Sequence, residues 1–260
     1  TFQYATNWSL SPREIATFFV PSAMGFGEGT YAGDMPFTNF PNYLGLGVLL
    51  FGSAAFVLLR GRLLWTLSLV AVLALFVSFG RHVPLVYGLF FDHLPYFNKF
   101  RVPVMILVLL QLAGCVLAGL GLSALWGQAP RHLEFRRPPT GREASRLAVA
   151  AATLAVLLVV LVQPWSGALA ARVAANPRLP AEAGPAYAAV ARTLLRGDGL
   201  RLAGLLAAHA AVVLLWWRRK LPGDAAGALL AGLAVVDLGS VDRRMVVPER
   251  TWPGVPARIE

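Results

Sequence analysis

The sequence is poor in charged residues, and it lacks several features that mark soluble enzymes. Charged side chains make up 14% of its 260 residues, whereas soluble domains average about 25%. Its single cysteine, Cys115, excludes a disulfide within the chain. The glycine-rich stretch GFGEG at residues 25–29 has no strand before it and no lysine after it, so it does not match a phosphate-binding loop. We therefore find no sign of a soluble nucleotide-binding domain.

Long apolar runs are what the sequence has instead. Hydrophobic residues make up 57% of the chain, with a mean hydropathy of +0.62, which indicates an integral membrane protein. The runs do not alternate apolar and polar residues as the strands of a membrane barrel do, so we predict an all-α, polytopic bundle. The six expected spans, of which the last is short, lie at residues 43–59, 63–79, 103–126, 147–165, 202–217 and 225–238.

The positions of the cations indicate how the bundle crosses the membrane. The net charge is +10, but ten of the 23 lysines and arginines fall in the short connections after the first, third and fifth spans. The positive-inside rule places these connections in the cytoplasm and both chain ends outside, which agrees with an even number of spans. We therefore expect a multi-pass membrane protein whose partner is the lipid bilayer and not nucleic acid. The dense cations are Arg60, Arg62, Arg131, Arg136, Arg137, Arg142, Arg146, Arg218, Arg219 and Lys220.

Four outer segments follow from this topology: residues 1–42, two loops at 80–102 and 166–200, and a tail at 239–260. In the first, Ser11 is a predicted N-cap and Pro12 opens a short helix. In the third, we predict an interfacial amphipathic helix near residues 182–196, with Tyr187, Val190 and Leu194 toward the lipid surface. The chain begins without methionine or a signal peptide, and we expect an upstream part and a continuation of the tail to be missing.

The loop at 80–102 holds the strongest candidates for binding an anion. Several cationic or hydrogen-bonding side chains crowd this loop beside a predicted span, where a lipid-borne phosphate would lie. Arg101 suits a phosphate better than Lys99, because a guanidinium can form paired hydrogen bonds. The alternative is that the long cations only extend toward lipid headgroups at the end of a span. The candidate phosphate-binding residues are Arg81, His82, Asn98, Lys99 and Arg101.

Carboxylates of the outer segments are candidates for a general base or for holding a divalent cation. They are Glu14, Glu28, Asp34 and Asp92. His82 and His93 show no ligand spacing with Asp92 that indicates a metal site.

Three other groups of polar or small residues have structural interpretations. We interpret His209 in the fifth span as a hydrogen-bonding residue between helices. Asp237 and Asp242 are expected on the outer surface. The small-residue pairs Gly114 with Ala118 and Gly227 with Ala231 suit close helix packing.

Four stretches of the sequence carry a family resemblance. They are YATNWSLSPREIATFFVPSAMGFG, GDMPFTNFPNYLGLGVLL, HLPYFNKFRVPVMILVLLQLAGCVLAGLGL and VVDLGSVDRRMV, in this order along most of the chain. The third is the most specific, because a proline, aromatic residues and an Asn-Lys-Phe-Arg run lead directly into a span. The chain resembles the middle and later portion of the YfhO family of bacterial polytopic membrane proteins.

The resemblance implies a glycosyltransferase-like protein of the GT-C type in a bacterial cytoplasmic (inner) membrane. Such proteins transfer a sugar from a polyprenyl-phosphate donor to a cell-envelope acceptor on the outer face. Their characteristic acidic residue lies in a loop that would precede Thr1, so the resemblance assigns no catalytic base here, and Glu14 and Asp34 are candidates by location alone. Two other classes stay open: a non-catalytic structural or assembly subunit with membrane-protein partners, and a lipid or solute transporter. Transporters place charged groups near mid-membrane, where we expect only His209 and Gln111.

Overall fold

The computed structural model describes residues 1–27, 29–35, 40–136, 141–177 and 179–246. In this part of the chain the fold is helical, apart from one pair of two-residue strands, which confirms the predicted all-α class. The chain divides into two compact units. Unit 1 comprises Thr1–Ile15, Asp34–Thr38 and Gly47–Pro139, and unit 2 comprises Ala16–Gly33, Asn39–Leu46 and Thr140–Glu260.

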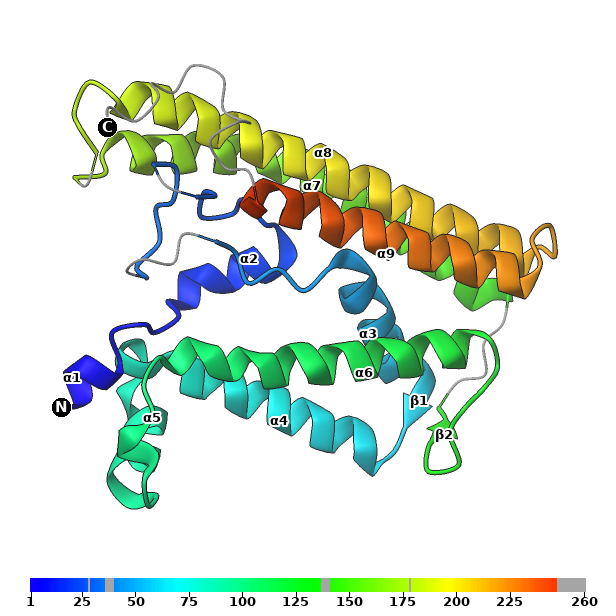
Figure 1. Ribbon diagram of the computed structural model, residues 1–260. Helices are drawn as coiled ribbons and strands as arrows, with labels where there is room; N and C mark the ends of the chain where they lie inside the picture. The colour runs from blue at the N-terminus through cyan, green and yellow to red at the C-terminus, as the bar shows by residue number, and fades with distance from the viewer. Residues whose placement is uncertain (28, 36–39, 137–140, 178, 247–260) are drawn as a thin grey trace. The chain divides into compact units, whose positions relative to one another are not determined.

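Unit 1 is built around the helices α3, α4 and α6. Helix α4 packs along α6, as Figure 1 shows. Strands β1 and β2 pair antiparallel, with Arg60 opposite Glu134, and these two side chains form an exposed ion pair with a shortest N to O distance of 2.7 Å. The elements are α1 (Phe2–Ala5), η1 (Pro12–Ile15), α3 (Leu46–Leu58), β1 (Leu59–Arg60), α4 (Arg62–Ser78), η2 (Gly80–His82), α5 (Pro84–His93), η3 (Phe97–Lys99), η4 (Pro103–Ile106), α6 (Leu107–Leu125) and β2 (Glu134–Phe135), where η denotes a 3-10 helix.

Glycines let α3 and α6 approach closely. A Cβ atom on Gly121 would lie 1.8 Å from the carbonyl oxygen of Phe51, and one on Gly114 would lie 3.2 Å from a methyl group of Val48. At these two glycines the backbone of α6 therefore contacts α3 directly. Such close approach at small residues is typical of helices packed in membranes. The predicted packing role of Gly114 is confirmed. Gly227, by contrast, has no neighbour within 4 Å of a built Cβ among the residues described.

Unit 2 contains three long helices and one short one. They are α2 (Ala16–Phe19), α7 (Gly141–Ala174), α8 (Gly184–Trp217) and α9 (Gly223–Val246). Helices α7 and α8 run side by side along most of their length, and α9 packs on α8 (Figure 1). Gly199 permits the closest contact of α8 with α7, because a Cβ atom there would lie 2.8 Å from a methyl group of Val162.

The third outer segment differs from the prediction. Residues 166–174 and 184–200 are not a loop with a separate amphipathic helix, but the adjoining ends of α7 and α8. Alanine-rich sequence favours helix, and Leu169 and Val173 are buried at this end of α7. The ring of Tyr187 also does not face lipid as predicted, since it lies against Gly29, where a Cβ atom would be 2.2 Å away.

Four of the helical segments described are long and apolar enough to cross a membrane. They are Pro103–Leu125, Val149–Ala174, Gly184–Trp217 and Gly223–Met245. Helices α3 and α4 are apolar but shorter, with 13 and 17 residues. The last expected span is longer than its apolar run, because α9 continues beyond residue 238 to Val246. These helices indicate a multi-pass membrane protein.

Candidate functional site

The N-terminal segment, residues 1–11, holds both ends of the cationic loop in unit 1. The backbone N–H of Leu10 donates to the carbonyl of Ser78 at the end of α4, at 2.8 Å. At the other end of the loop, the N–H of Val102 donates to Ala5 at 3.3 Å and that of Val104 donates to Trp8 at 3.2 Å. The beginning and the end of the loop at 80–102 are therefore fixed to one short segment.

The first cations of the loop are positioned by Gly80 and Ser9. Gly80 has a φ of +41°, and a Cβ atom there would lie 2.1 Å from the Ser9 hydroxyl, so this position requires glycine. The Ser9 hydroxyl accepts the backbone N–H of Arg81 at 3.1 Å. The guanidinium of Arg81 donates to the backbone carbonyl of Asp34 at 3.3 Å. A predicted cation and a predicted carboxylate residue are thus brought together.

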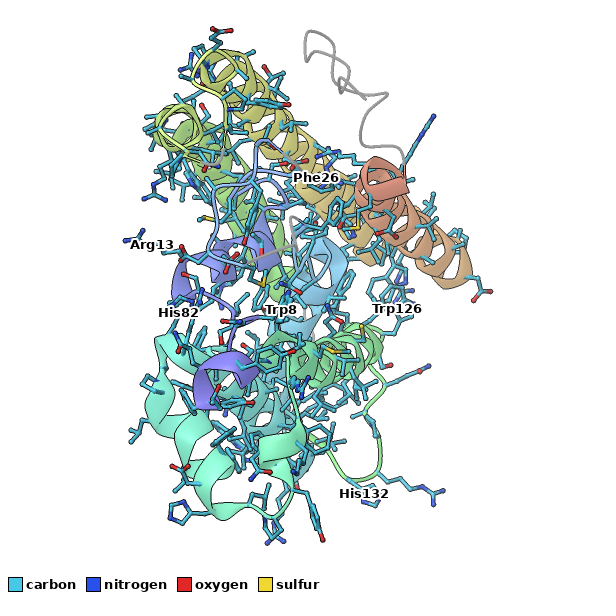
Figure 2. The ribbon with its side chains drawn as sticks, turned by 60° about the vertical axis from the view of Figure 1, so that its left-hand side comes forward. Trp8, Arg13, Phe26, His82, Trp126 and His132 are labelled. Carbon is cyan, nitrogen blue, oxygen red and sulfur yellow. The ribbon has the colours of Figure 1, made fainter. Side chains whose placement is uncertain are left out.

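His82 belongs to the same cluster. Burial, followed by the positive charge of Arg81, lowers the pKa of His82, while the carboxylate of Asp34 acts in the opposite direction. The imidazole is half-buried, and its Nε2 atom is buried without a hydrogen-bond partner among the described residues. Figure 2 shows His82 and Trp8 within unit 1. Arg81, His82 and Asp34 therefore form one polar cluster.

Arg101 lies at the other end of the loop. Its guanidinium carbon is 4.7 Å from the centre of the Tyr4 ring, and Nη1 donates to the Tyr4 hydroxyl at 3.2 Å. The side chain is exposed, as are those of Asn98 and Lys99 on η3. Helix α1, which carries Tyr4, contacts η3. The structure therefore places these three predicted residues around α1 and holds Arg101 by an aromatic face, a contact that favours a cation.

Aromatic rings hold the loop between its two cationic ends in a defined shape. Phe2 contacts the rings of Tyr87 and Phe91 edge to face, with centroids 5.8 and 5.4 Å apart. Tyr87 also contacts Phe97 at 5.3 Å and donates its hydroxyl to the carbonyl of Phe100 at 3.5 Å. Burial raises the pKa of Tyr87, which keeps it a neutral hydrogen-bond donor. Such ring contacts add stability beyond area burial.

The two candidate bases have different environments. Glu14 is 1% exposed, and its carboxylate accepts the backbone N–H of Ser11 at 2.7 Å. This contact caps the N-terminus of the short helix that was predicted to begin at Pro12, so Glu14 has a capping role. Asp34 is exposed, as is Asp92, whereas Glu28 lies outside the described residues. Within the described ranges, no three histidine, cysteine or acidic side chains form a group that could hold a metal ion.

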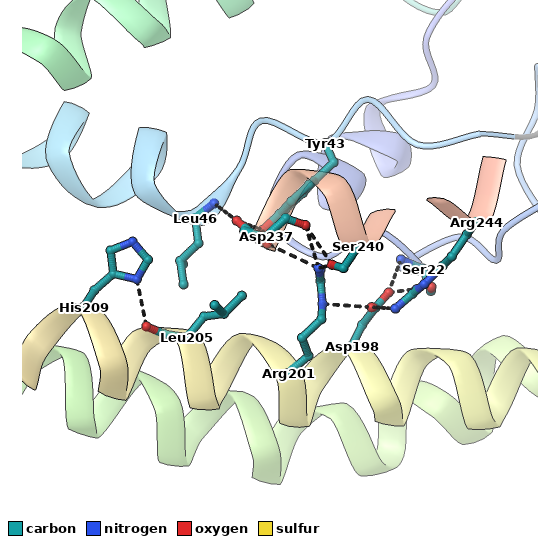
Figure 3. A network of polar contacts seen from close by, with 10 residues as sticks. All are labelled: Ser22, Tyr43, Leu46, Asp198, Arg201, Leu205, His209, Asp237, Ser240 and Arg244. Atoms are coloured by element: carbon teal, nitrogen blue, oxygen red, sulfur yellow. Dashed lines mark hydrogen bonds and ion pairs between the residues drawn. The ribbon is translucent and has the colours of Figure 1, made fainter. Parts of the chain in front are cut away.

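A second polar site, in unit 2, surrounds Asp237 (Figure 3). The Asp237 side chain is 1% exposed. Its carboxylate accepts the Tyr43 hydroxyl, at 2.9 Å to each oxygen, and the backbone N–H of Leu46 at 2.7 Å. Arg201 on α8 approaches the same carboxylate at 3.3 Å, and it also donates to the hydroxyl of Ser240. Asp237 therefore joins α9 to α8 and to the segment around Tyr43.

Asp198 forms the other half of this buried network. Its carboxylate is fully buried and accepts both the backbone N–H and the hydroxyl of Ser22, at 3.0 and 2.5 Å. Arg201 and Arg244 lie 3.4 and 2.8 Å from one oxygen of Asp198. Two carboxylates and two guanidiniums balance in charge, as buried ions must. Their hydrogen bonds occupy both carboxylates, which suits a structural role.

This network corrects the surface position that we predicted for Asp237. The carboxylate is buried because the guanidinium of Arg201 and the donors of Tyr43 and Leu46 replace its water. Asp242, five residues further on, is exposed as predicted. An acid inside an apolar run, together with the i, i+3 pair Asp198 and Arg201, was the sequence signal for the network. The Nδ1 atom of His209 lies 2.8 Å from the carbonyl of Leu205 in its own helix.

Comparisons with known proteins identify no relative: no family model, no curated protein and no solved structure matches this chain.

Proposed function

We propose that the chain is a membrane-embedded, glycosyltransferase-like protein that handles a polyprenyl-phosphate-linked sugar at the outer face of a bacterial inner membrane. One observation carries the proposal: a single N-terminal segment organises Arg81, His82 and Arg101 beside the ends of two apolar helices. Cations at that level would meet a lipid-borne phosphate at the depth where it lies. The resemblance in sequence supports the same reaction class.

In the proposed transfer, the bond between the sugar's anomeric carbon and the phosphate oxygen breaks, and a bond to the acceptor's hydroxyl oxygen forms. The hydroxyl proton passes to a carboxylate, and the polyprenyl phosphate departs with the bonding electrons. Arg81 and Arg101 would stabilise the charge on the departing phosphate. Of the two candidate bases, Asp34 suits proton transfer better, because Glu14 is buried and already accepts a backbone N–H.

The first test is lipid binding by the purified chain. Polyprenyl phosphate would be titrated into the chain in nanodiscs, and the bound lipid counted by native mass spectrometry. Arg101→Ala should weaken binding at least about tenfold, the equivalent of one charge-assisted hydrogen bond, and Arg101→Lys should restore part of it. Arg131→Ala is the control, since Arg131 is also exposed but lies in the turn between α6 and β2. Equal binding by all variants would contradict the proposal.

A second candidate is a structural or assembly subunit without turnover. The buried network favours it, because the carboxylates of Asp198 and Asp237 are fully engaged in holding helices together. This function predicts stoichiometric membrane-protein partners after gentle extraction and no lipid-phosphate binding. Transport is less well supported. Asp198, Arg201 and Asp237 lie within candidate membrane helices, but protein donors already occupy both carboxylates, which suits a structural role better than a substrate or ion site.

A further inference from the structure

Helix α5 differs from its neighbours in direction. Figure 1 shows that α5 runs across the direction of α4 and α6, to which it is connected at either end within unit 1. If α4 and α6 cross the membrane, α5 must lie along its surface. The connections of α5 to its neighbours are short, since α4 ends at Ser78, α5 spans Pro84–His93 and η4 begins at Pro103. The segment between them is therefore held at the level where the two apolar helices end.

The outward side of α5 carries large apolar side chains that nothing in the described part of the chain covers, and the exposed polar residues Asp92 and His93 lie at its C-terminal end. Leu85 and Leu89, four residues apart on one face of the helix, are 82% and 60% exposed. Beyond the helix, Tyr96 and Phe100 are 79% and 68% exposed. Tyr96, the residue that precedes η3, also has a φ of 63°, a rare conformation for a tyrosine. An exposed apolar group of this kind marks an interaction surface.

The inner side of the same segment is already occupied. Tyr87 is 2% exposed and contacts the rings of Phe91 and Phe97. The aromatic rings on the inner side of the segment pack against one another and form its core. The apolar residues on the outward side are therefore not needed for that core. Cations follow directly, at Lys99 and Arg101, and both are exposed. Leucines and aromatic rings with adjoining cations are typical of helices that lie in the membrane interface.

We propose that residues 84–100 form an interfacial anchor that inserts Leu85, Leu89, Tyr96 and Phe100 into the boundary between lipid headgroups and acyl chains. The occupant is the bilayer that the chain itself crosses, because exposed apolar residues continue along the chain from α5 through η4 to α6, where Met105 of η4 and Leu112 of α6 are 71% and 61% exposed. The inference rests on exposure and helix direction. It is independent of the proposed sugar transfer, and it holds equally for a structural subunit.

The test uses spin labels in a chain whose only natural cysteine, Cys115, has been changed to alanine. Leu89→Cys is the test position. Leu112→Cys on α6 is the lipid control, because its native side chain is 61% exposed against 60% for Leu89. His132→Cys, at the tip of the turn between α6 and β2 (Figure 2), is the water control. Each label is exposed to oxygen, which concentrates in lipid, and to a water-soluble nickel chelate, in phosphatidylcholine and phosphatidylglycerol vesicles.

The expected result is that the Leu89→Cys label collides with oxygen more than with the nickel chelate, at a depth of about 5–10 Å below the headgroups. The Leu112→Cys label should lie deeper, and the His132→Cys label should favour the nickel chelate. Two results would overturn the proposal. Preference for the nickel chelate at Leu89→Cys would place α5 in water, and low collision with both reagents would show that protein covers it. A Leu85→Cys label, one turn away, repeats the measurement should the first variant fail to fold.

Discussion

Removing the Asp237 carboxylate should destabilise the protein strongly. In Asp237→Ala, the hydroxyl of Tyr43 and the backbone N–H of Leu46 lose their acceptor, and Arg201 loses one of its two ion pairs and keeps the one with Asp198. Each buried donor without a partner costs about 1–3 kcal/mol, and breaking a buried ion pair costs about 3–5 kcal/mol. Because these costs overlap, we expect the free energy of unfolding to fall by about 3–5 kcal/mol in total.

A second variant measures how much of this loss comes from the hydrogen bond between Tyr43 and Asp237. Tyr43→Phe removes only the hydroxyl that donates to Asp237, and a hydrogen bond to a charged group contributes about 1.5–3 kcal/mol. In the Asp237→Ala background the same change should cost almost nothing, because its acceptor has already gone. The coupling between the two positions measures the contact itself.

The assay is a titration with SDS in mixed micelles, followed by fluorescence of the seven tryptophans. Asp242→Ala is the matched control, because Asp242 is an exposed acid on the same helix, and its loss should change the free energy of unfolding by less than about 0.5 kcal/mol. Equal free energies of unfolding for Asp237→Ala and Asp242→Ala would refute the reasoning.

Three further predictions concern unit 1. Gly121→Leu should lower the free energy of unfolding by about 1–3 kcal/mol or more, because a Cβ atom at this position would lie 1.8 Å from a carbonyl oxygen of α3. The control is Gly119→Leu, because a Cβ atom there has no described neighbour within 4 Å. In a thermal melt, the control should unfold like the parent. Since the pKa of His82 is lower in the folded protein, the unfolded state binds more protons below about pH 6.5. Stability should therefore fall as the pH is lowered through that value, and His82→Gln should remove this part of the pH profile. Glu134→Gln breaks an exposed ion pair and should change the free energy of unfolding by less than about 1 kcal/mol.

Helix type and approximate position follow from the sequence because they depend on local apolar runs. The six expected segments all correspond to helices, and Pro12 and Gly114 behave as their local patterns indicate. The ends of the long helices were harder to predict. A loop was expected at 166–200 because its apolar content falls there, but α7 and α8 stabilise each other through contacts such as Gly199 on Val162, which no local window contains.

In the candidate sites too, local features could be predicted from the sequence and long-range contacts could not. Arg81, His82 and Arg101 could be named from one loop, since they lie within 21 residues of sequence. The burial of Asp237 could not, because its donors Tyr43 and Leu46 are 194 and 191 residues away along the chain. A long-range partner decides whether an acid in an apolar run is a structural ion or a reactive one.

That distinction narrows the search for a catalytic base. A carboxylate whose lone pairs are already occupied by protein donors, as in Asp198 and Asp237, would have to give up those bonds before it accepted a proton from a substrate. Glu14 is likewise engaged with Ser11. Asp34 differs, because it is exposed and its backbone carbonyl is held by the guanidinium of Arg81. A transferase holds its base and the cations that receive the departing phosphate in one active site. If this unit contributes a base, the contact between Asp34 and Arg81 makes Asp34 the residue to change first, with Asp34→Asn expected to abolish transfer and leave lipid binding intact.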